Sequence, residues 1–60
     1  MITLTVGYDE IALWFFVVKQ DEAVLHFRHG FRSHDEASQT GDAWIRDELG
    51  LSPENGGYDV

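Results

Sequence analysis

The sequence predicts an α+β domain in which a three-stranded antiparallel β-meander carries one C-terminal helix on one face (βββα). Three observations lead to this prediction: three segments are rich in β-branched and aromatic residues, short polar breaks separate them, and helical spacing begins after residue 33. Strands joined by short breaks pair as antiparallel hairpins, and a helix buries its apolar stripe on a sheet. We expect residues 1–51 to form one domain and residues 52–60 a flexible acidic tail.

The first two strands are predicted on either side of a tight turn. "MITLTVGY" alternates apolar and polar residues, as a half-buried strand does. Asp9 and Glu10 interrupt it, and residues 11–19 form the second strand, since β-branched and aromatic residues favour strands. "ALWFFVVK" has seven consecutive apolar residues, so we expect either that both faces of this central strand are covered or that one face is left exposed for a partner.

The third strand and the helix follow another polar break. "AVLHFRHGFR" is read as a strand in which Gly30 marks a bulge or bend. "SHDE" is a capping box with Ser33 at the N-cap and Glu36 three residues later. The helix is predicted from His34 to Leu49, with Gly50 as its C-terminal cap and Leu51 as the hydrophobic partner of that cap.

Of the two faces of the predicted sheet, one is expected to be covered by the helix and the other is not. We expect the helix to cover the face that carries the core, which comprises Ile2, Leu4, Val6, Ile11, Leu13, Phe15, Val17, Leu25, Phe27 and Phe31, with Trp44, Ile45 and Leu49 from the helix. The opposite face is predicted to carry Thr3, Thr5, Ala12, Trp14, Phe16, Val18, His26, Arg28 and Arg32. No remaining element is available to cover this second face unless the tail folds back over it. Alternatively, a shifted register would exchange the residues between the two faces.

Composition narrows the classes of function. The 60 residues carry a net charge of −7 and no Cys, with seven acids against one Arg in residues 35–60. A negative domain repels nucleic-acid phosphates and favours a basic protein partner. The apolar run of residues 11–18 is far shorter than the ~20 residues that cross a bilayer. We expect a cytoplasmic protein with no membrane partner.

Catalytic and metal chemistry find little support in the sequence. His26, His29 and His34 lie within nine residues, but a regular strand points His26 and His29 to opposite faces. Ser33 is explained as a helix cap, and no G-x-S-x-G, H-E-x-x-H or P-loop pattern occurs. We therefore expect no enzyme, no metal site and no cofactor.

We favour the interpretation that the protein is a small interaction module that self-associates through its open sheet face. One role for such a module is that of a phage or mobile-element factor that acts on a host protein. Exposed aromatic residues beside Arg are typical of interfaces. The predicted interface comprises Trp14, Phe16, Val18, His26, Arg28 and Arg32.

Two alternatives remain open. The helix carries acids that resemble a nucleic acid in charge, which would make the protein an inhibitor of a basic partner; these are Asp35, Asp42, Asp47 and Glu48, with Glu36 beside them. Alternatively, aromatic residues and Arg on the sheet face bind nucleic acid by stacking and phosphate contacts.

The segment "FRSHDEASQTGDAWIRDELG", residues 31–50, resembles a known junction between sheet and helix. It is similar to small β-β-β-α domains that include the N-terminal arm-binding domain of phage-type integrases and small uncharacterised bacterial or phage proteins. The resemblance implies the βββα fold, and in the integrase-like domains it would imply DNA contact by the sheet. The acidic character of this chain departs from that pattern.

Overall fold

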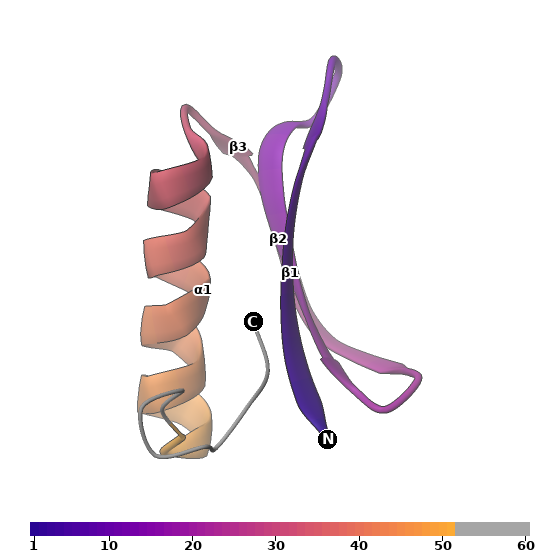
Figure 1. The fold of residues 1–60 in the computed structure, drawn as a ribbon, viewed down its shortest axis with the longest axis vertical. Coiled ribbons are helices and arrows are strands. Elements are labelled where there is room, and N and C mark those ends of the chain that lie inside the picture. The colour runs from indigo at the N-terminus through magenta and orange to yellow at the C-terminus, as the bar shows by residue number, and fades with distance from the viewer. Residues whose placement is uncertain (52–60) are drawn as a thin grey trace.

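The predicted βββα fold is confirmed. A computed structural model describes residues 1–51, and the tail predicted over residues 52–60 lies outside the described residues. The elements are β1 (Ile2–Asp9), β2 (Leu13–Gln20), β3 (Ala23–Phe31) and α1 (His34–Leu49). The strands form one antiparallel sheet in the order β1-β2-β3, and α1 packs against one of its faces (Figure 1).

The turn between β1 and β2 determines the register of the sheet. Asp9 pairs with Leu13, so residues 10–12 form the turn, and its carboxylate Oδ1 accepts hydrogen bonds from the backbone N–H groups of Ile11 (2.8 Å) and Ala12 (3.1 Å). This arrangement is typical of an Asp-initiated turn. Because three residues separate the strands, even-numbered residues of β1 pair with even-numbered residues of β2.

The predicted assignment of β2 to the two faces was wrong. A two-residue turn at Asp9 and Glu10 would have paired even-numbered residues with odd-numbered ones, whereas Leu4 pairs with Val18 and Val6 pairs with Phe16. Directly paired residues share a face. Phe16 and Val18 therefore lie under the helix with no exposed surface, together with Leu4 and Ile45.

Other predicted core residues of the sheet and helix are also more exposed than expected. Ile11 lies in the turn and is 94% exposed, while Leu13, Leu25, Phe27 and Leu49 are between 37% and 48% exposed. Ile2, Val6, Phe31 and Trp44 are partly buried against the core, as predicted. Phe15 and Val17 are partly exposed on the side of the sheet away from α1.

Two irregularities in the pairing of β2 with β3 decide which residues of β3 face the helix. The register shifts between Trp14 and Phe15, opposite Gly30, and again between Val18 and Lys19, opposite Leu25. Gly30 has a φ of 89°, which suits glycine, so the predicted bulge or bend at this residue is confirmed. The bulge at Gly30 turns Phe31 to the helix side although Phe27, four residues earlier, lies on the other side.

The helix begins and ends at the predicted residues. Ser33 Oγ accepts a hydrogen bond from the Glu36 backbone N–H (3.1 Å), and Gly50 closes the helix in a left-handed conformation with its N–H bonded to the Arg46 carbonyl (3.0 Å). The buried helix residues are Ala37, Gly41 and Ile45, spaced by four as expected for one buried stripe. Leu51 packs on the core after the cap.

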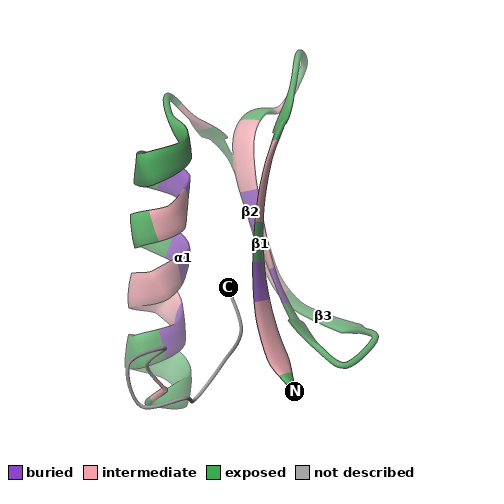
Figure 2. Cartoon of the chain, in the orientation of Figure 1, coloured by how far each residue is buried: buried purple, intermediate pink, exposed green. Residues whose placement is uncertain are grey.

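The helix lies mainly over β1 and β2 and makes less contact with β3. Figure 2 shows the buried residues where α1 faces β1 and β2, while most of β3 is exposed. No helix in the described part of the chain is both long and apolar enough to cross a bilayer. Because α1 packs on one face only, the other face of the sheet is left without cover from any described element.

Replacing Gly41 by Ala should destabilise the domain despite the better helix propensity of Ala. A Cβ at this position would lie 2.6 Å from Leu4 Cδ1 and 3.1 Å from Phe16 Cδ1, both in the core. Overpacking of a core costs about 1–3 kcal/mol, against a propensity gain of about 1 kcal/mol. We expect a net loss of about 1 kcal/mol in urea unfolding, with Gln39→Ala on the exposed helix surface as control. A more stable Gly41→Ala variant would contradict the close packing.

The Asp9 turn should make part of the stability depend on acid pH. The hydrogen bond from the Ile11 N–H, followed by that from Ala12, lowers the pKa of the Asp9 carboxyl below its ordinary value of 3.8. A lowered folded-state pKa stabilises the fold above the unfolded pKa, and this stabilisation is lost as pH falls through the folded value.

We expect the difference in unfolding free energy between the natural chain and Asp9→Asn to shrink as the pH is lowered from 5 to 2. Asn retains the side-chain oxygen as acceptor but does not ionise in this range, so it isolates the charge. A difference that stays constant over this pH range would mean that the Asp9 charge does not support the turn.

Candidate open-face interface

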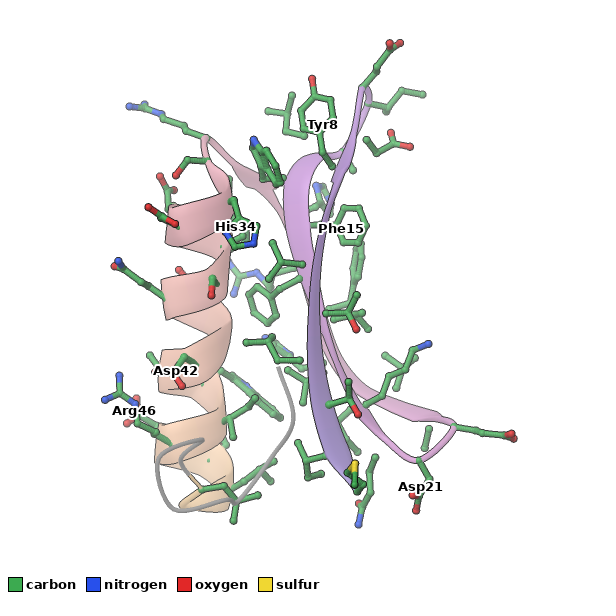
Figure 3. The ribbon with its side chains drawn as sticks, in the orientation of Figure 1. Tyr8, Phe15, Asp21, His34, Asp42 and Arg46 are labelled. Atoms are coloured by element: carbon green, nitrogen blue, oxygen red, sulfur yellow. The ribbon has the colours of Figure 1, made fainter. Side chains whose placement is uncertain are left out.

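The face of the sheet away from α1 presents an array of nine residues, which we name the open face. Its members lie in three rows across β1, β2 and β3, as the pairing of the strands defines: Thr3, Lys19 and Val24; Thr5, Val17 and Phe27; Gly7, Phe15 and His29. Figure 3 shows Phe15 on this side of the sheet, opposite to α1.

Large apolar groups are exposed on the open face. Phe27 is 48% exposed and Val24 is 59% exposed. The Phe27 ring lies between those of Phe15 and His29, with centroid distances of 5.8 Å to each. These tilted pairs form a cluster of three rings across β2 and β3. Contiguous apolar surface of this kind on a small domain is typical of an interaction site.

The nine residues of the open face include no acid; the next row, Asp9 with Leu13, ends the sheet at the turn, where the Asp9 carboxylate accepts hydrogen bonds from the turn N–H groups. Lys19 is the single Lys or Arg of the open face, and His29 is its single His. In the described part of the chain the acids lie in the turns, at the end of β1 and on α1. The face is therefore close to neutral although the whole chain has a net charge of −7. An apolar partner, including another acidic protein, meets little charge repulsion there.

The residues that the sequence predicted for the interface lie elsewhere. Phe16 and Val18 are buried under the helix, so their predicted place on the open face is wrong. Trp14 pairs with Tyr8 and Phe31 on the helix side, where its ring makes edge contacts with Tyr8 (5.3 Å) and His34 (5.7 Å).

The remaining predicted interface residues lie along β3 and beyond it. His26 pairs with Val18 and stacks flat on Trp44 of α1, with a centroid distance of 4.6 Å and an interplanar angle of 4°. Arg28 pairs with Phe16, so it too is on the helix side although exposed. Arg32 is exposed in the link between β3 and α1. Of the residues predicted on the open face, Thr3 and Thr5 are confirmed there.

The acidic helix residues are divided between paired and exposed positions. Asp42 forms an ion pair with Arg46 at 3.3 Å, and its side chain is 30% exposed. Asp35, Asp47 and Glu48 are exposed. Figure 3 shows Asp42 and Arg46 side by side on α1, away from the sheet. An i,i+4 pair of this kind is a common stabiliser of a solvent-exposed helix surface.

The three histidines point to different surroundings. His26 lies on the helix side and His29 on the open face, as their predicted divergence requires, and His34 starts the helix. Among residues 1–51 no group of three His, Cys, Asp or Glu side chains could hold a metal ion. Every buried side-chain nitrogen or oxygen in this part of the chain has a hydrogen-bond partner.

Comparison of the chain with protein-family models, with curated proteins and with solved structures found no match. The resemblance of residues 31–50 to integrase arm-binding domains stays a prediction. The open face is thus defined by the geometry of this chain alone.

Truncation of Phe16 and of Phe27 should separate the buried face from the open face. Phe16→Ala removes a ring with no exposed surface, which costs about 3–5 kcal/mol, comparable to the whole stability of a domain this small. Phe27→Ala removes a half-exposed ring and loses cross-strand contacts worth about 0.2–1 kcal/mol. Urea unfolding at low protein concentration measures both. A larger loss for Phe27→Ala than for Phe16→Ala would contradict the register.

Proposed function

We propose that this protein is a non-enzymatic interaction module that self-associates through the open face. The observation that carries the proposal is the exposure of Phe27 and Val24 in a nine-residue array that has no acid. A domain of about 60 residues buries only about 60% of the surface of its unfolded chain, so association adds burial that the fold lacks. Covering the open face would give β2 two buried faces.

The size of the open face suits a weak dimer. Strands of eight or nine residues rise about 3.3 Å per residue and lie about 4.8 Å apart, so the sheet face measures about 27 by 14 Å. Two such faces in contact bury on the order of 1,000 Å² in total, near the lower limit for a specific interface. Weak and transient complexes lie at this lower end of the size range, so we expect a reversible dimer.

The charge distribution supports a second copy as the partner. Two chains of charge −7 repel each other, and the repulsion is least where their acid-free faces meet. Added salt screens this repulsion, so self-association should strengthen from low to moderate salt. Binding of the acidic helix to a basic partner would instead weaken with salt.

The replacement Phe27→Asp should abolish self-association and leave the monomer folded. The natural chain is expected to rise from 6.8 kDa toward twice that mass as its concentration increases, measured by light scattering. Phe27→Asp places a charge in the centre of the apolar contact, where its desolvation is unfavourable. The variant should stay at the monomer mass at every concentration with an unchanged circular dichroism spectrum.

A matched control makes the same chemical change away from the open face. Ile11 is 94% exposed but lies in the β1–β2 turn, so Ile11→Asp should dimerise as the natural chain does. A natural chain that stays monomeric up to millimolar concentration would contradict the proposal, as would equal dimerisation of Phe27→Asp.

A further inference from the structure

The side chains of the open face increase in size across the sheet. The β1 column consists of Thr3, Thr5 and Gly7, and the β3 column consists of Val24, Phe27 and His29; Phe27 and His29 are larger than Thr5 and Gly7, while Val24 and Thr3 are similar in size. The Phe15 ring lies against Gly7, because a Cβ there would approach Phe15 Cζ to 2.6 Å. The lowest part of the open face is therefore the surface of Thr3 and Thr5, and its highest part is the β3 column.

Two-fold symmetry offers two ways to place one open face on another. An axis perpendicular to the strands places β1 on β1 and β3 on β3, so the large columns meet and the small columns are held apart. An axis parallel to the strands places β1 of each copy on β3 of the other, so the large Phe27 faces the small Thr5, and Val24 faces Thr3 of similar size. Close packing without gaps favours the second arrangement, since a gap forfeits contacts on both sides.

We propose that the protein forms a sheet-on-sheet dimer whose two-fold axis runs parallel to the strands, with β1 of each copy packed on β3 of the other. This inference rests on the proposed self-association through the open face. The symmetry assigns the facing pairs: Phe27 contacts Thr5 of the second copy, Val24 contacts Thr3, and His29 contacts the Phe15 ring over Gly7. Residues of β2 face their own counterparts, so Lys19 faces Lys19 and Val17 faces Val17.

The charges of the open face oppose this arrangement only weakly. Lys19 is exposed at the end of β2, and two exposed ammonium groups that can turn outward repel by less than about 1 kcal/mol. The Asp9 and Glu10 turns of the two copies lie together at one end of the sandwich, and the Asp21 and Glu22 turns lie together at the other end beside Lys19; these exposed charges are screened by salt. Packing of Phe27 on Thr5, which occurs twice in the dimer, favours this arrangement against these exposed repulsions.

Cross-linking at Lys19 distinguishes the two arrangements, because the natural chain has no Cys. With the axis parallel to the strands, the two residues at position 19 face each other across about 10 Å, the spacing of packed sheets. With the perpendicular axis placed near the centre of the face, they lie at opposite ends of the sandwich. Lys19→Cys should therefore form covalent dimers rapidly with a short bis-maleimide, whereas Gln39→Cys, whose thiol is exposed on α1 on the other side of the sheet, reports only random collision.

Light scattering on the same samples separates this inference from the proposed function. Dimer mass with rapid cross-linking of Lys19→Cys, at least tenfold above Gln39→Cys, is the expected result. Dimer mass with equal rates for the two variants would overturn the parallel axis and leave self-association standing. Monomer mass for the natural chain would overturn both.

Discussion

The turn held by the Asp9 carboxylate is the constraint on which the rest of the structure depends. It places three residues between β1 and β2 and so pairs Leu4 with Val18 and Val6 with Phe16. A one-residue change in that spacing would exchange the two faces of β2, because side chains alternate along a strand. The close contact of Gly41 with Leu4 and Phe16 exists only in this register. The core beneath the helix and the composition of the open face are thus decided together.

A single helix is too narrow to cover a three-stranded sheet evenly. α1 approaches β1 and β2 closely through Ala37 and Gly41, whose small side chains let the backbone lie near Leu4 and Phe16. Its reach to β3 depends on larger groups, chiefly the flat stack of Trp44 on His26. The helix thereby secures all three strands from one side. Nothing in residues 1–51 packs on the other side, where the open face lies.

The sequence predicted the elements and the helix ends because their signals are local. Ser33 with Glu36, Gly50 with Leu51, and the polar breaks between strands each act over a few residues. The faces of β2 could not be assigned in this way, since Leu13, Phe15 and Val17 are as apolar as Trp14, Phe16 and Val18. Ile11 and Ala12 are apolar and look like strand residues, which concealed the third residue of the turn. On β3, the bulges at Leu25 and Gly30 changed the alternation, and only the second had a sequence signal.

The strong acidity of the chain and its apolar open face are compatible because they occupy different parts of the molecule. Acids on α1 and in the turns oppose contacts in which one copy presents its helix layer or its strand ends to another. The acid-free open face is the contact that this repulsion disfavours least. A neutral chain with the same sheet would be free to associate through many surfaces, and exposed strands would then promote aggregation. In the proposed dimer, the net charge of −7 would favour one defined pairing over many, even though it would weaken the pairing itself.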